Sequence, residues 1–215
     1  MATPHASPEC AIAVFARAPV PGEAKTRLVP KLGAEGAAKL HARLVERMLR
    51  TASRAGPGPV TLWCAGSPDH PFFRACAETF GVRLVEQAPG DLGERMHAVF
   101  VERAGRPALL AGTDCPAITT DHLRACARAL AEGDDAVFLP AEDGGYGLVG
   151  LNRPVPEIFR DMTWSTDTVM AETRARLRAL GLVWREPATI WDVDRPEDAD
   201  RLAASGLMDD APPLA

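Results

Sequence analysis

One stretch decides the fold: PALLAGTDCP, residues 107–116. Its residues 108–112 are apolar without interruption, which is typical of a strand covered on both faces, as in a parallel sheet. Asp114 follows at the carboxyl end of that strand, where ligands bind in open α/β sheets, and Pro116 stops the strand from continuing. Asp114 is therefore either a ligand for a divalent metal or a phosphate ester, or a residue that caps a turn; the local spacing leaves both open.

The composition indicates one soluble α/β domain. The chain has 215 residues, 47% of them hydrophobic, which is enough for a full core. Its net charge of -5 argues against non-specific binding to nucleic acid, and no apolar stretch is long enough to insert into a membrane. We expect a single domain over residues 11–207, with flexible tails at 1–10 and 208–215. The sequence does not indicate an oligomeric state.

The cysteines and the start of the chain predict a reduced, cytoplasmic protein. The five cysteines are an odd number and form no C-x-x-C pair, so neither a disulfide framework nor a zinc site is indicated. Residues 1–10 lack the basic and apolar regions of a signal peptide. Cys115, beside Asp114, could be a nucleophile, but no histidine lies near it in the sequence. A small filler at a strand end is the favoured role.

Strands alternate with helices along the chain. This order predicts a doubly wound α/β domain with a mostly parallel sheet and helices on both faces. The expected strands cover residues 11–16, 60–65, 82–86, 108–112, 136–139, 148–151 and 190–194. The expected helices cover residues 34–52, 71–80, 92–100 and 120–130, a segment from its cap at 164–167 to Leu180, and a last segment from Pro196. In the last strand, strict alternation would place Asp192 and Asp194 on the same face.

Four loops should gather along one edge of such a sheet, at residues 17–27, 87–95, 113–116 and 140–147. The first lies between a strand and a helix, contains glycine and carries Lys25 and Arg27, a layout that holds phosphates. Asp114 and Asp194 would lie opposite, so that cations for phosphates face paired acids for hydrated magnesium. The first loop is neither a Walker A nor a Rossmann motif, and a solvated basic loop is the alternative.

Residues 140–147 form another Gly-rich segment, which contains the only tyrosine of the chain, Tyr146. The Gly144-Gly145 pair lets the backbone approach a ligand closely, and Asp143 is a further candidate acid. A tight hairpin into the strand at 148–151 explains the same residues equally well.

Several segments together resemble one protein family. They are FARAPVPG at 15–22, KTRL at 25–28, GDLGERM at 90–96, GTDCP at 112–116, DGGY at 143–146, WST at 164–166 and DVD at 192–194. The combination resembles the bacterial "transferase 1, rSAM/selenodomain-associated" family of the GT-A nucleotide-diphospho-sugar transferase superfamily, some members of which are classed as arsenosugar-biosynthesis glycosyltransferases. The chain departs from that pattern at Arg17, where lysine is usual, and at Gly147, where a second aromatic residue is frequent.

More distantly, the chain is similar to the guanylyltransferases of 2-phospho-lactate, phosphoenolpyruvate and the molybdenum cofactor. The resemblances imply a GT-A fold with Mg²⁺ or Mn²⁺ bound by Asp114 and Asp194, and catalytic roles for Lys25, Asp114 and Asp143. The implied nucleotide- and phosphate-binding residues are Pro21, Gly22, Lys25, Arg27, Gly90, Gly93 and Arg95. The implied acceptor-binding residues are Asp143, Gly144, Gly145, Tyr146 and Trp164.

Together, these expectations predict a metal-dependent transferase that uses a nucleotide-activated donor and a small-molecule acceptor. The closer resemblance favours a glycosyltransferase with a nucleotide-diphospho-sugar, in which Asp143 is a candidate base for an acceptor hydroxyl. The alternative is a nucleotidyltransferase that moves NMP from an NTP to a small phosphorylated acid and releases pyrophosphate. The pair of cations suits a triphosphate slightly better than a diphosphate, since more negative charge must be neutralised. A catalytically silent binding module is a third reading, because fold does not fix function.

Overall fold

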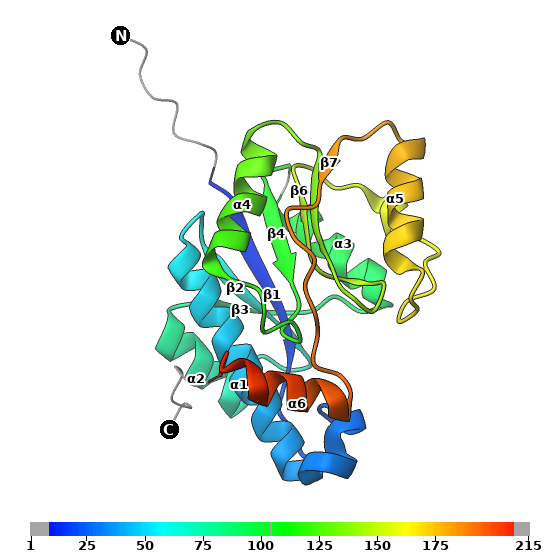
Figure 1. Cartoon of the computed structure of the whole chain (residues 1–215). Coiled ribbons are helices and arrows are strands. Elements are labelled where there is room, and N and C mark those ends of the chain that lie inside the picture. The colour runs from blue at the N-terminus through cyan, green and yellow to red at the C-terminus, as the bar shows by residue number, and fades with distance from the viewer. Residues whose placement is uncertain (1–8, 104, 209–215) are drawn as a thin grey trace.

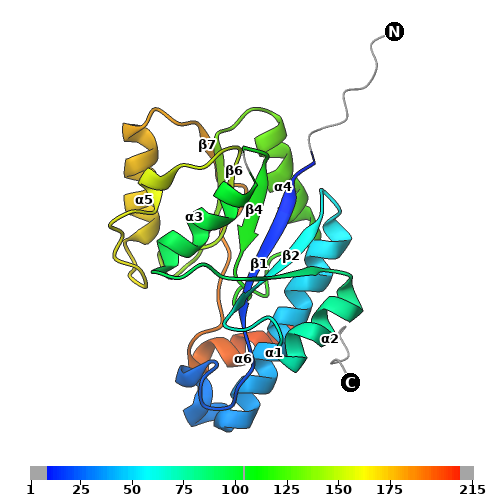
Figure 2. The same ribbon diagram turned by 180° about the vertical axis from the view of Figure 1, so that it is seen from behind.

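The computed structural model describes residues 9–103 and 105–208, and its centre is a seven-stranded sheet (Figures 1 and 2). The strands are β1 (Ala11–Arg17), β2 (Val60–Ala65), β3 (Arg83–Glu86), β4 (Ala108–Ala111), β5 (Ala136–Pro140), β6 (Tyr146–Leu151) and β7 (Trp184–Arg185). They lie in the order β3-β2-β1-β4-β6-β5-β7. β6 runs antiparallel to its neighbours β4 and β5, and the other pairs are parallel. The prediction of a mostly parallel sheet is confirmed.

Helices cover both faces of this sheet, as predicted (Figures 1 and 2). The helical segments are η1 (Thr26–Leu28), α1 (Val29–Ala55), α2 (Pro71–Phe80), α3 (Leu92–Glu102), α4 (Thr120–Ala131), η2 (Pro156–Ile158), α5 (Val169–Ala179) and α6 (Pro196–Ser205). One hydrophobic cluster joins the sheet to α1, α2 and α4, and a second joins it to α3 and α5. Within β1, Ile12 and Val14 belong to the first cluster and Ala11 and Ala13 to the second. The strand is apolar throughout because each face is buried.

A third hydrophobic cluster lies beside the sheet, where α6 meets the start of α1 (Figure 1). Leu28, just before α1, and Val193, just before α6, are both fully buried in it. Burial of these two side chains fixes the backbone next to Arg27 and next to Asp194. This cluster therefore brings a loop near the start of the chain against a segment near its end.

Two predictions of local structure are wrong. Residues 190–194, called here the acidic arm, do not form a strand: Ile190 makes one isolated bridge to Ala141, and the backbone N–H of Val193 donates to Asp114. Ile190 bonds only to the end of β5 and the loop after it, since its N–H donates to the Pro140 carbonyl and its own carbonyl accepts from Glu142. The last strand is instead β7, beside β5. Residues 164–167 do not cap a helix either, because α5 begins only at Val169.

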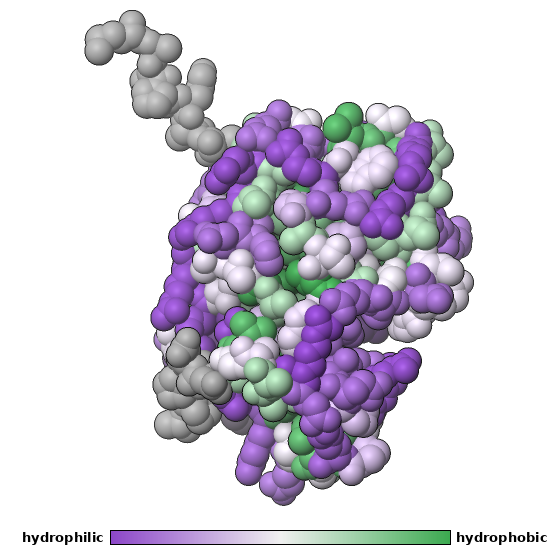
Figure 3. All heavy atoms as spheres, in the orientation of Figure 1, coloured by the Kyte–Doolittle hydropathy of each residue, from purple (hydrophilic) through white to green (hydrophobic). Residues whose placement is uncertain are grey.

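The described part of the chain extends slightly into both predicted tails. Cys10 and Met208 are buried, and residues 1–8 and 209–215 lie outside the described residues. Hydrophilic side chains cover most of the face shown in Figure 3, with smaller hydrophobic areas between them. Within the described ranges, no helix is both long and apolar enough to cross a membrane.

Candidate functional site

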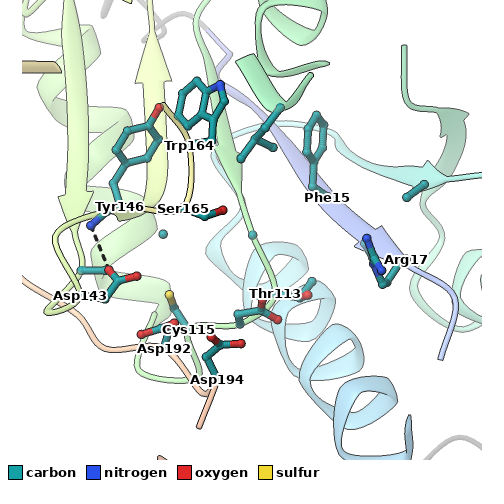
Figure 4. A pocket seen from close by; sticks show the side chains of 18 of the residues that line it. Phe15, Arg17, Thr113, Cys115, Asp143, Tyr146, Trp164, Ser165, Asp192 and Asp194 are labelled. Atoms are coloured by element: carbon teal, nitrogen blue, oxygen red, sulfur yellow. Dashed lines mark hydrogen bonds between the residues drawn. The ribbon is translucent and has the colours of Figure 1, made fainter. Parts of the chain in front are cut away.

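A cavity of about 630 Å³ opens at the edge of the sheet where β1 and β4 end. Its lining comes from β1 and the loop after it, the 87–96 segment, residues 112–115, residues 141–147, residues 164–169 and the acidic arm (Figure 4). The four loops that were predicted to gather at one edge all contribute, so this prediction is confirmed. The described residues thus place the candidate cations, acids and aromatic side chains around one space.

Lys25 is the most tightly held charged residue of the site. It has a left-handed backbone conformation, with φ of 51°, which is strained for a residue other than glycine. Its side chain is only 4% exposed, and its Nζ lies 2.8 Å from Oδ1 of Asp114 and donates to the carbonyl of Val193 at 2.5 Å. The Asp114 side chain is 52% exposed, so its carboxylate stays accessible from the cavity. An ammonium has three N–H groups, and two of them are used here.

Arg27 and Asp194 form a second ion pair, much more open than the first. Their side chains are 67% and 36% exposed. The backbone N–H groups of Asp194 and Arg195 both donate to the carboxylate of Asp198 at the start of α6, which holds the end of the acidic arm. Both predicted cations and both predicted metal ligands are therefore together, and they are paired with one another.

Two further carboxylates line the cavity: Asp192 lies beside Asp194, and Asp143 lies on the other side of Asp192 (Figure 4). Oδ1 of Asp143 accepts a hydrogen bond from the backbone N–H of Gly145 at 2.9 Å, so it also shapes the turn. Asp192 is half-buried. Burial, and then the charge of Asp143, raise the pKa of Asp192 from 3.8 to about 6. The two acids thus repel each other above that pH.

Replacing Asp192 by asparagine is expected to stabilise the protein at pH 7.5. A folded-state pKa above the unfolded one contributes stability that is present below about pH 4 and lost as the pH rises through about 6. The gain in melting temperature should therefore shrink on acidification towards pH 4, measured calorimetrically with a chelator present. Asp69→Asn, at an exposed ion pair, is the control and should show no such gain. An unchanged melting temperature at pH 7.5 would show that the Asp192 carboxylate is not destabilised by burial or by the charge of Asp143.

Cys115 serves packing rather than nucleophilic chemistry. Burial, and then the charge of Asp114, raise the pKa of its thiol well above the usual value, so thiolate is scarce at neutral pH. A Cβ atom at Gly147 would lie 2.5 Å from its Sγ, so the thiol packs closely against this glycine. All five cysteines are free and buried.

Aromatic side chains form the wall of the cavity beyond Asp143. The rings of Tyr146 and Trp164 meet edge to face with centroids 6.5 Å apart, and Phe138 supports Tyr146 from behind at 5.2 Å. Ser165, next to Trp164, lines the cavity with a left-handed φ of 65°. Of the three such residues other than glycine in the described ranges, two, Lys25 and Ser165, line this cavity, and strain of this kind concentrates at ligand sites.

Some predicted site residues lie outside the lining. The cavity is lined by Lys25, Arg27, Arg95, Asp114, Asp143, Gly145, Tyr146, Trp164 and Asp194, but not by Pro21, Gly22, Gly90, Gly93 and Gly144. Gly93 lets α3 approach its neighbours, because a Cβ there would lie 2.6 Å from the carbonyl oxygen of Phe159 and 2.9 Å from the Trp164 ring. Gly144 has φ of 90°, and a Cβ atom added there would clash with the Asp167 carbonyl. These two glycines support the site through packing.

His41 is a lining residue that the sequence did not indicate. It is a buried residue on α1, and its Nε2 hydrogen-bonds with the carbonyl of Arg17 at 3.1 Å, where β1 ends. Burial lowers the pKa of His41, which favours the neutral ring. One histidine on an amphipathic helix carries no sequence signal of such a role. Asp192 did carry one, its shared face with Asp194, but it was not assigned to the site.

The carboxylates of Asp114 and Asp194 suit a hard divalent cation that arrives with a phosphate. Among the described residues, no group of three or more His, Cys, Asp or Glu side chains could hold a metal on its own. Mg²⁺ is usually held by one or two carboxylates together with substrate phosphates and water, rather than by a cage made of protein alone. The residues therefore fit a metal that is shared with a phosphorylated ligand.

Comparison with family models gave one match, over residues 48–166, to DUF2064, described as an uncharacterized protein conserved in bacteria. The chain belongs to this family. No curated protein matches the sequence. The DUF2064 match does not test the resemblance to the rSAM-associated transferases.

Several solved structures similar to this DUF2064 chain are described as transferases. One from Desulfovibrio desulfuricans G20, provisionally described as a nucleotide-diphospho-sugar transferase, has a TM-score of 0.83 and 27% identity over 93% of this chain and 88% of that one. A nucleotidyl transferase from Methanothermobacter thermautotroptrophicus has a TM-score of 0.62 and 18% identity over 94% and 99%. Glucosyl-3-phosphoglycerate synthase from Mycobacterium tuberculosis, in complex with Mn²⁺ and UDP, has a TM-score of 0.54 and 12% identity over 94% and 76%. The fold is that of the nucleotide-sugar transferases and nucleotidyltransferases.

Proposed function

We propose that this protein is a metal-dependent glycosyltransferase that uses a nucleotide-diphospho-sugar. The observation that carries the proposal is the pairing of Lys25 and Arg27 with Asp114 and Asp194 in the lining of one cavity. Cations for a diphosphate and acids for its metal lie within contact distance of each other there. The similarity to a nucleotide-diphospho-sugar transferase structure over most of both chains supports this reading. The five free thiols support a reducing, cytoplasmic setting.

At this donor end, the protein's own residues would bind and orient the diphosphate. Asp114 and Asp194 would hold Mg²⁺ or Mn²⁺, which when bound supplies positive charge to the departing nucleoside diphosphate. Lys25 would place its remaining N–H on a phosphoryl oxygen, held in position by Asp114 and the Val193 carbonyl. The 87–95 segment lines the same cavity and would face the base.

The other end of the cavity favours an acceptor without negative charge. Asp143, Tyr146 and Trp164 lie there, whereas Arg17 lies across the cavity (Figure 4). Arg95 lines the same cavity from α3, and its Nε donates to the Gly90 carbonyl at 2.9 Å. The charged side chain beside Tyr146 is the carboxylate of Asp143, with that of Asp192 next to it, so a phosphorylated acid would meet negative charge there (Figure 4). A sugar-like hydroxyl compound fits better.

Nucleotidyl transfer is the second candidate, and two observations favour it. The chain aligns with 99% of a nucleotidyl transferase, and two cations can neutralise a triphosphate. The products separate the two reactions. Glycosyl transfer releases a nucleoside diphosphate, whereas nucleotidyl transfer releases pyrophosphate.

The test is phosphorus NMR of the protein with Mg²⁺ and a panel of nucleotide-diphospho-sugars, then with nucleoside triphosphates and phosphorylated acids. We expect a nucleoside diphosphate to appear from one sugar nucleotide, slowly with water alone and faster with a hydroxyl acceptor. Pyrophosphate from a triphosphate, with every sugar nucleotide left intact, would establish nucleotidyl transfer instead.

Lys25→Met is expected to weaken nucleotide binding about tenfold to a hundredfold, the range for loss of one charged hydrogen bond. Methionine keeps the length of the side chain but removes its charge. Lys39→Met, on the exposed side of α1, is the matched control and should bind as the wild type does. Isothermal titration calorimetry with Mg²⁺ present measures both. Equal affinities in the two variants would remove the 17–27 loop from the site.

A further inference from the structure

Each carboxylate proposed as a metal ligand already has a cation of the 17–27 loop on it. Asp114 is paired with Lys25, and Asp194 is paired with Arg27. The charges of these two ion pairs sum to zero, so the net negative charge nearby comes from Asp143 and Asp192. A bare divalent cation that approaches Asp114 and Asp194 would be repelled by the two cations paired with them. A diphosphate that binds together with the metal brings negative charge that can pair with these two cations. The two ion pairs therefore disfavour binding of the metal alone and favour its binding together with a diphosphate.

The two ion pairs differ in how easily they can open. The Lys25 side chain is 4% exposed and also donates to the Val193 carbonyl, so moving it would leave a buried ammonium without partners. The Arg27 side chain is 67% exposed, and an exposed ion pair of this kind contributes little to stability. Arg27 is thus the cation that can leave its carboxylate at small cost.

We propose that Arg27 is a resident counter-ion that covers Asp194 until a donor diphosphate draws it away, so that Asp194 becomes a metal ligand only together with the nucleotide. This inference rests on the proposed function. Lys25 stays on Asp114 and adds a phosphoryl oxygen to its contacts, whereas Arg27 exchanges one anionic partner for another. The metal and the diphosphate then bind with positive cooperativity, and each raises the affinity for the other by the same factor.

The backbone on both sides of this pair is fixed, so the exchange needs only side-chain rotation. Leu28 and Val193, which are next to Arg27 and Asp194 in the sequence, are fully buried in the same hydrophobic cluster. Asp198 holds the backbone N–H groups of Asp194 and Arg195. The Asp194 carboxylate therefore keeps its position while the long, exposed side chain of Arg27 rotates away from it.

The experiment measures Mn²⁺ binding by electron paramagnetic resonance, with and without nucleoside diphosphate, in Arg27→Gln and in the wild type. Arg27→Gln should bind Mn²⁺ alone about fivefold more tightly, because its Asp194 is uncovered. It should also show a smaller increase in Mn²⁺ affinity when the diphosphate is added. Lys31→Gln removes a cation from a neighbouring ion pair between α1 and α6, to Asp200, and should behave as the wild type does. Arg27→Lys, which keeps the charge, should also resemble the wild type.

The inference is overturned if Arg27→Gln binds Mn²⁺ alone no more tightly than the wild type, or if Lys31→Gln gains as much. Either result can occur while the wild type still binds Mn²⁺ and nucleoside diphosphate together, which would leave the proposed function intact. Loss of diphosphate binding in every protein, the wild type included, would instead overturn the proposed function and this inference with it. Melting curves of all variants confirm that they are folded.

Discussion

Asp114→Asn is expected to lower turnover about a thousandfold or more. The metal contributes several kcal/mol of charge stabilisation to the departing diphosphate, and about 4 kcal/mol corresponds to a factor of a thousand. Asparagine keeps the size of the side chain but removes the charge that holds both the metal and Lys25. Turnover is measured as release of nucleoside diphosphate from the sugar nucleotide that the wild type uses.

Asp121→Asn is the matched control for Asp114→Asn. It also removes an aspartate from an ion pair, with Arg124, but on the exposed start of α4 and outside the cavity lining. It should leave turnover within about twofold, since exposed ion pairs contribute little. Activity of Asp114→Asn within tenfold of the wild type would place the metal elsewhere, and the pair formed by Asp143 and Asp192 would be the next candidate.

Asp143→Asn is expected to lower turnover about a hundredfold or more while donor and metal binding stay intact. This is the usual scale for loss of a general base. The carboxylate oxygen that accepts from Gly145 can be replaced by the amide oxygen of asparagine, so the turn should keep its shape. The rate is followed with acceptor present, and binding of Mg²⁺ and nucleotide by calorimetry.

Asp167→Asn controls for the nearby loss of charge, because Asp167 is exposed and lies outside the lining. Weakened magnesium-dependent nucleotide binding in Asp143→Asn would make Asp143 a metal or donor residue. Full turnover would show that Asp143 only shapes the turn, and Asp192 would then be the carboxylate to test.

The strands and the edge they share could be predicted because their signal is local. Runs such as residues 108–111 are apolar on both faces, and parallel strands end at the same edge, so the sequence alone predicts that Lys25 and Asp114 lie at one edge of the sheet. The expectation that the cations lie opposite the acids was wrong, because Lys25 and Asp114 form an ion pair. Glycines were harder to interpret. Gly93 and Gly144 resemble ligand-approach positions in the sequence, but their space is taken by the carbonyls of Phe159 and Asp167.

The acidic arm could not be predicted, because its shape depends on partners far away in the sequence. Its alternating carboxylates resemble a strand, yet Ile190 only touches the end of β5 at Pro140, and Val193 donates to the carbonyl of Asp114 in a loop. The pairing of Arg27 with Asp194 depends on the same long-range packing, through Leu28 and Val193. The sequence around Arg27 and the sequence around Asp194 contain no signal that these two side chains form an ion pair.

The most direct test of the proposed donor site is anomalous diffraction from a crystal soaked with Mn²⁺ and the nucleoside diphosphate that binds most tightly. We predict one Mn²⁺ in the cavity, bound by Asp114 and Asp194, with the diphosphate on Lys25 and Arg27. An Mn²⁺ held by Asp143 and Asp192 instead, or a cavity that takes no nucleotide, would contradict it.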